Sequence, residues 1–122
     1  MVRNSFLKVF FIALIVRLLY SLASPGVFYF NADTQGYYTL GLEMFTHPSL
    51  QTVITPYRTP VYPLFLNGVM YLSGSGGTQF GSPAFLRGAQ VVALVQMIFG
   101  AFAFTVFYSV LKRFLPARTR LP

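Results

Sequence analysis

The feature that most constrains this chain is an uncharged run of 21 residues, from Val91 to Leu111. As an α-helix with a rise of about 1.5 Å per residue, the run is about 32 Å long, close to the thickness of a bilayer's hydrocarbon core. Pro83 suits the first turn of such a helix, and Lys112 and Arg113 follow its apolar end. The sequence therefore predicts a transmembrane helix over residues 84–113.

A second apolar run covers residues 6–23 and is interrupted only by Lys8 and Arg17. A signal peptide is the alternative, because a basic start precedes the apolar centre and small residues follow it. A charge deep in the apolar part weakens a signal peptide, so Arg17 favours a membrane anchor. A cation inside a span costs about 2.5–3.5 kcal/mol. We therefore expect Arg17 either to extend toward the nearer interface, at Ala23, or to face a partner helix or an anionic headgroup.

The composition is that of a chain surrounded largely by lipid and only partly by water. Charged residues make up 9% of the sequence, whereas a soluble domain carries about 25%. The net charge of +7 comes from basic residues at the ends of apolar segments, which fits membrane topology and excludes nucleic acid as the expected partner. Cysteine is absent, so disulfides, thiolate chemistry and zinc–thiolate sites are excluded.

Two shorter helices are predicted between the spans. Residues 34–46 place polar and apolar side chains on opposite sides of a helix, and residues 61–72 form an apolar helix after a proline-rich entry. Both are too short to cross a bilayer, so we expect them to lie in the membrane surface. The Gly/Ser-rich residues 73–78 are expected to form a flexible linker.

The predicted fold class is thus an all-α membrane protein, a single module over residues 1–122. Transmembrane helices at about 6–23 and 84–113 are joined by an outer loop, residues 24–83, with interfacial helices at about 34–46 and 61–72. Basic residues precede the first span and follow the second: Arg3, Lys8, Lys112, Arg113, Arg118 and Arg120. The positive-inside rule then predicts an integral plasma or inner membrane protein with both termini cytoplasmic and the loop extracytoplasmic.

Candidate chemistry in this loop centres on Asp33, one of only two acidic residues. As a helix cap, Asp33 would accept a bond from first-turn amides, worth about 1 kcal/mol. As a functional group, it would be a general base or a metal ligand at the membrane surface. Arg58 could bind a phosphate or simply lie at the interface. Glu43 is expected to be solvated, and His47 has no second ligand at metal spacing, so no metal site is predicted.

A set of short motifs occurs in a fixed order over residues 6–115. Arg17 lies in the first span, Asp33 and paired tyrosines (Tyr37, Tyr38) follow, and then come Arg58, Pro60, Tyr62 and Pro63 before a short apolar helix, with Gln90 and Gln96 in the second span. This order resembles the amino-terminal end of the GT-C membrane glycosyltransferases. The most similar group is the protein mannosyltransferase and aminoarabinose transferase-like enzymes.

The resemblance implies sugar transfer from a polyprenyl-phosphate carrier on the extracytoplasmic side. Asp33 matches the family's acid/base position and would deprotonate the acceptor hydroxyl, while Arg58, Tyr37 and Tyr38 would contact the substrate. The implied partners are the lipid bilayer and the polyprenyl-phosphate-linked sugar. A divalent metal is compatible with the resemblance, but the sequence leaves the cofactor unknown.

The chain also departs from the family. Thr34 follows Asp33 where many members have Glu, and those members have many more spans. We therefore expect an amino-terminal fragment that is inactive alone. The first alternative is a non-catalytic two-span protein that associates with a larger membrane partner, which would give Arg17 a polar neighbour. The second is a basic protein secreted after signal cleavage, which Arg17 and the second span disfavour.

Overall fold

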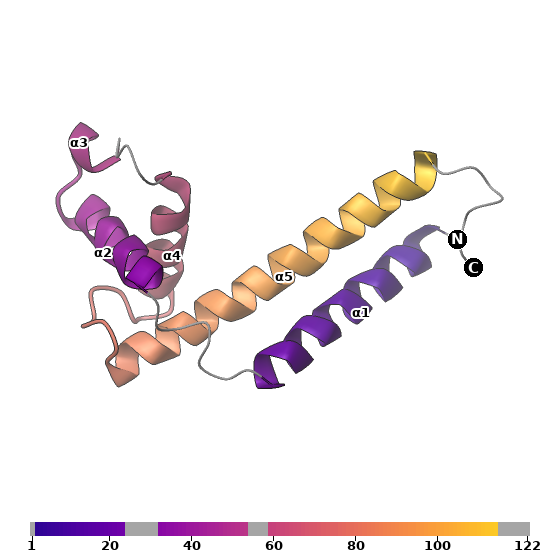
Figure 1. Cartoon of the computed structure of the whole chain (residues 1–122), viewed down its shortest axis with the longest axis horizontal. Helices are drawn as coiled ribbons and strands as arrows, with labels where there is room; N and C mark the ends of the chain where they lie inside the picture. Colours follow the sequence, from indigo (N-terminus) through magenta and orange to yellow (C-terminus); the bar gives the residue numbers. More distant parts are fainter. Residues whose placement is uncertain (1, 24–31, 54–58, 115–122) are drawn as a thin grey trace. The chain divides into compact units, whose positions relative to one another are not determined.

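A computed structural model of the chain describes residues 2–23, 32–53 and 59–114. These residues form helices joined by turns and bends, with no strand among them (Figure 1). The helices are α1 (Val2–Ala23), α2 (Ala32–Thr46), α3 (Leu50–Val53), α4 (Val61–Leu72) and α5 (Pro83–Phe114). The predicted all-α class is confirmed, and so are the two helices long and apolar enough to span a membrane.

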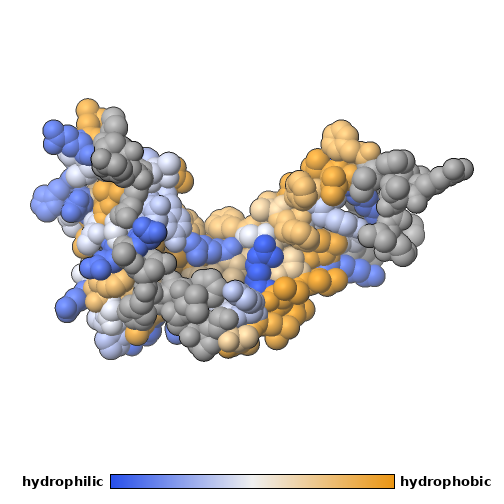
Figure 2. All heavy atoms as spheres, in the orientation of Figure 1, coloured by the Kyte–Doolittle hydropathy of each residue, from blue (hydrophilic) through white to orange (hydrophobic). Residues whose placement is uncertain are grey.

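The apolar surface of these two helices distinguishes them from the core helices of a soluble protein. Only 6% of the apolar window in Ser5–Ala23 and 17% of that in Pro83–Phe114 is buried. Figure 2 shows hydrophobic residues across α1 and the carboxy-terminal part of α5. Exposed apolar surface of this extent marks contact with a membrane or with another protein, and in two helices of this length it supports a membrane protein.

The shorter helices agree with the sequence except in two details. α4 has the predicted bounds, whereas α2 begins at Ala32, two residues before the predicted start at residue 34. The four-residue helix α3 was not expected, because residues 48–59 read as a polar connector. At the start of α3, the backbone N–H of Ser49 donates to the Thr52 hydroxyl and the backbone N–H of Thr52 donates to the Ser49 hydroxyl. This local capping arrangement was not predicted from the sequence.

The contacts divide the chain into two compact units that share α5. Unit 1 comprises Met1–Pro25 and Val95–Pro122, and unit 2 comprises Gly26–Leu94. In unit 1, Phe6 of α1 meets Phe102 of α5 edge to face, with ring centroids 6.2 Å apart. Ala13, Ala101 and Thr105 are buried there. Small residues of this kind allow two membrane helices to approach closely.

Unit 2 has an enclosed hydrophobic core. It is built from α2, α4 and the first part of α5, and its buried members are Tyr38, Leu66, Met70, Phe85 and Val92. The Phe80 and Phe85 rings lie 4.6 Å apart. α2 packs along α4, so these two helices of the predicted outer loop form a pair. Their predicted position in the membrane surface stays a prediction.

The Gly/Ser-rich segment between α4 and α5 is not the flexible linker that its composition suggests. Ser75 is buried, and its backbone N–H donates to the Met70 carbonyl at 2.8 Å. Gly74, Gly77 and Gly81 have positive φ, which permits the sharp turns of this segment. Gly88 of α5 fits against Ser75, because a Cβ there would lie 2.6 Å from the Ser75 Cβ. Glycine here serves turns and close contacts, not flexibility.

Candidate functional site

Asp33 lies in the first turn of α2 and is exposed. Because α2 begins at Ala32, Asp33 is inside the helix and not at the residue before it, where the capping interpretation placed it. The positive end of the helix dipole still favours a carboxylate at this position. The side chain is therefore both compatible with the helix start and accessible from solvent, as a group acting on an external substrate must be.

An aromatic pair lies one helical turn beyond Asp33. Tyr37 is four residues later on α2, which places it on the same side of the helix. Its ring meets Tyr62 of α4 edge to face, with centroids 5.0 Å apart, and Tyr62 is 6.4 Å from Phe65. α2 and α4 thus bring together a carboxylate and an aromatic row from positions almost 30 residues apart.

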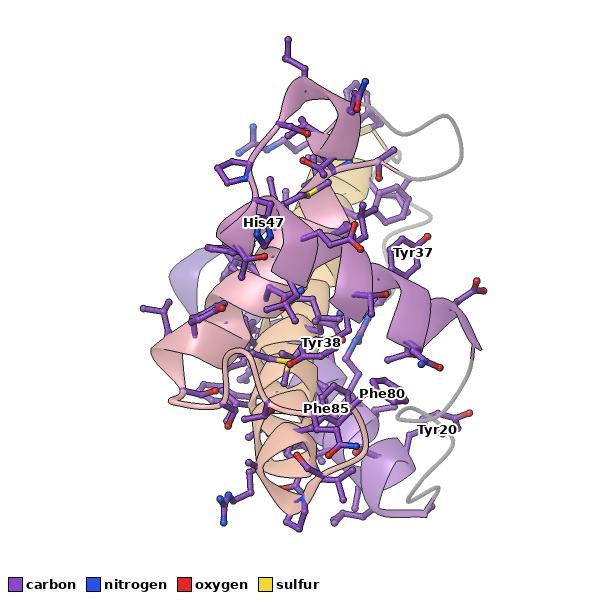
Figure 3. The ribbon with its side chains drawn as sticks, turned by 90° about the vertical axis from the view of Figure 1, so that its left-hand side faces the viewer. Tyr20, Tyr37, Tyr38, His47, Phe80 and Phe85 are labelled. Carbon is purple, nitrogen blue, oxygen red and sulfur yellow. The ribbon has the colours of Figure 1, made fainter. Side chains whose placement is uncertain are left out.

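Tyr38 has a different environment from its neighbour. It is 2% exposed, and its hydroxyl donates a short hydrogen bond to the Thr78 carbonyl. Its ring packs edge to face on Phe85 at 5.0 Å. Figure 3 shows Tyr38 beside Phe80 and Phe85, while Tyr37 lies elsewhere on α2 and His47 follows the end of that helix. The predicted substrate-binding pair is therefore split, with Tyr37 partly accessible and Tyr38 in the core.

Asn67 of α4 holds the two site helices together. It is completely buried, and its Nδ2 donates to the Tyr38 carbonyl at 3.0 Å and to the Pro63 carbonyl at 3.2 Å. The orientation of the amide is fixed, because exchanging its oxygen and nitrogen would face Oδ1 against two carbonyl oxygens. Among the described residues Oδ1 has no hydrogen-bond partner. Sequence reasoning missed Asn67, since a single Asn in an apolar helix carries no signal of its partner.

Gly41 explains why α2 and α4 can approach so closely at this point. A Cβ on Gly41 would lie 2.1 Å from the Asn67 Nδ2 and 2.4 Å from the Pro63 carbonyl oxygen. Both distances are far below van der Waals contact, so only glycine fits. Gly41 and Asn67 together set the spacing of α2 and α4, and hence the position of Asp33 and Tyr37 relative to Tyr62.

The remaining candidates are not gathered at this site. Arg58 lies outside the described residues. Glu43 and His47 are exposed, and the His47 Nδ1 is 3.0 Å from the Thr46 hydroxyl. The described residues contain no group of three or more His, Cys, Asp or Glu side chains that could hold a metal ion. Comparisons with protein-family models, curated proteins and solved structures find no match to this chain.

Proposed function

We propose that this chain is the amino-terminal part of a GT-C-like glycosyltransferase, in which Asp33 acts as the acid/base for sugar transfer from a polyprenyl-phosphate carrier. The observation that carries the proposal is the exposed carboxylate of Asp33 one turn from the Tyr37–Tyr62 pair. Aromatic faces accept the apolar C–H faces of a sugar ring, and a carboxylate accepts its hydroxyl protons. The site is borne by a chain with two membrane-spanning candidates, as a lipid-linked donor requires.

In the proposed reaction Asp33 takes the proton of the acceptor hydroxyl as its oxygen attacks the anomeric carbon. The bond from that carbon to the carrier phosphate breaks, and the phosphate leaves with the electron pair. Arg58 is proposed to stabilise the leaving phosphate and Tyr37 to orient the sugar. Tyr38 supports the site through the core of unit 2, where its hydroxyl holds the Thr78 carbonyl.

The proposed topology places residues 24–83 on the extracytoplasmic side and both termini in the cytoplasm of a plasma or inner membrane. It rests on Arg3 before the first span, Lys8 near the start of that span, and Lys112 and Arg113 after the apolar run of the second. Because the chain has no cysteine, a Gln51→Cys variant gives a single labelling site on exposed α3. A membrane-impermeant maleimide should label it in intact cells, and labelling only after lysis would reverse the topology.

Asp33→Asn tests the catalytic role, with Glu43→Gln as the matched control on the same helix. General acid–base groups contribute about 10²–10⁴-fold to rate, so Asp33→Asn should lower transfer from a radiolabelled polyprenyl-phosphate hexose at least 100-fold. Glu43→Gln should leave it within twofold. The assay uses native membranes that contain the full chain, since we expect the 122-residue chain to require additional protein for activity. Equal rates in both variants would refute the role of Asp33.

A second candidate is a non-catalytic two-span protein that associates with a larger membrane partner. The burial of Tyr38 favours it, because one of the predicted substrate-binding residues is used for packing. The two candidates separate in the same assay. No transfer in native membranes with the unaltered chain, together with copurification of the chain with another membrane protein, would favour the second.

A further inference from the structure

Arg17 places a permanent positive charge near the centre of the first span. It lies six residues before the end of the apolar segment Ser5–Ala23, about 9 Å along the helix. Its side chain does not extend toward that nearer end, as snorkelling would require. Instead Nη1 donates to the Ala13 carbonyl at 3.3 Å, one turn in the opposite direction and about 15 Å from Ala23. The charge is therefore held at mid-membrane depth.

Within unit 1, the Arg17 guanidinium packs against α5 at Gly100. A Cβ on Gly100 would lie 3.0 Å from the Arg17 Nε and 3.5 Å from its Nη2, so the guanidinium lies against bare backbone at Gly100. Arg17 is only half-buried, and it leaves part of the group accessible from the side of the helix pair. Within the described residues its one hydrogen bond is to Ala13, although a guanidinium has five N–H donors.

The missing partner must be an anion at the same depth, because arginine does not lose its proton in proteins. Lipid phosphates lie beyond the hydrocarbon core, about 15 Å from its centre, out of reach of a side chain directed inward. Neither span carries a carboxylate side chain, since the two acidic residues of the sequence, Asp33 and Glu43, are both on α2. A second copy has the same two spans and equally lacks an acidic residue there.

We propose that the Arg17–Gly100 face of unit 1 docks a membrane helix from outside these 122 residues that carries Asp or Glu near its midpoint. Intramembrane charges are almost always paired or face a protein interior. A planar guanidinium suits a carboxylate, which can accept two parallel N–H bonds from it. The proposal does not depend on the role of Asp33, and it names the chemistry and the depth of the partner.

The test measures binding of synthetic transmembrane peptides to the full chain in phosphatidylcholine vesicles by fluorescence energy transfer. The peptides share one Leu/Ala sequence with Asp, Asn or Leu at the central position. The Asp peptide should bind at least tenfold more tightly than the Asn and Leu peptides. Arg17→Leu should abolish this preference, and because it makes α1 more apolar it should not impair insertion.

Lys8→Leu is the matched control, since Lys8 is an exposed cation near the start of the same helix. It should retain the preference for the Asp peptide, whereas Gly100→Leu should weaken that preference by displacing the guanidinium. Equal binding of all three peptides would overturn the proposal. So would loss of the preference when phosphatidylglycerol replaces a third of the phosphatidylcholine, because a lipid headgroup would then be the occupant.

Discussion

The two units differ in how far their large apolar side chains are buried. In unit 2 Phe85 is 1% exposed and packs on Tyr38 and Phe80, whereas in unit 1 Phe107 of the same helix is 64% exposed. Polar groups differ as well, since unit 2 encloses Asn67 with two hydrogen bonds and unit 1 holds a cation at the surface of its helix pair. Unit 2 is built like a small protein core, while unit 1 depends on its surroundings. Substitutions matched between the units can test this contrast.

The largest expected effect comes from Phe→Ala substitutions on α5. Phe85→Ala should lower the free energy of unfolding of unit 2 by about 3–5 kcal/mol, because it leaves a cavity in a closed core. Phe107→Ala should change stability by less than about 1 kcal/mol, because its ring is already exposed. Unfolding in dodecylmaltoside micelles, followed by circular dichroism and amide exchange, measures both. Equal losses would mean that the units do not differ in the way described.

A smaller effect separates two glycines within unit 2. Gly41→Ala should destabilise by about 1–3 kcal/mol, because the added methyl group overlaps Asn67 and the backbone at Pro63. Gly68→Ala should stabilise by about 0.5–1 kcal/mol, since it is a helical glycine with nothing within 4 Å of its added Cβ. The same unfolding measurement applies. A neutral Gly41→Ala would show that α2 and α4 are not in close contact.

The smallest expected effect is that of one buried hydroxyl. Tyr38→Phe should cost about 0.5–1.5 kcal/mol, because it removes the donor to the Thr78 carbonyl and keeps the ring packing. Tyr71→Phe is the control, since that ring is 42% exposed and packs on Phe45. Amide exchange across residues 73–82 should rise in Tyr38→Phe alone. An unchanged exchange rate there would remove Tyr38 as the group that anchors this segment.

The sequence predicted the elements well because each carries its own signal. The uncharged run from Val91 and the apolar run from Phe6 both have the length and hydropathy of long apolar helices, and α4 begins after the proline-rich entry, as proline geometry favours. The site was predicted less completely. The exposure of Asp33 and the place of Tyr37 follow from α2 alone, but the partner ring of Tyr62 depends on how α2 meets α4.

Other features had no local signal. Tyr37 and Tyr38 are adjacent and chemically identical, and only the packing of Phe80 and Phe85 decides which of them is buried. The turn segment after α4 has the composition of a linker, yet it is ordered by local bonds to the end of α4 and by the bond from Tyr38 to Thr78, 40 residues away in sequence. The inward direction of Arg17 likewise depends on the absence of a side chain at Gly100.

The contact at Gly41 limits how the α2–α4 pair can move. A shift of α2 along α4 by one helical turn would bring the side chain of Tyr37 or Phe45 to a position where even a single Cβ atom overlaps the neighbouring helix. Sliding of packed helices is therefore blocked, although it is a common mode of conformational change. The Asn67 amide adds a directional bond to the same point. Any opening of this pair must be a hinge that separates the helices, with the Asn67–Tyr38 bond broken as it begins.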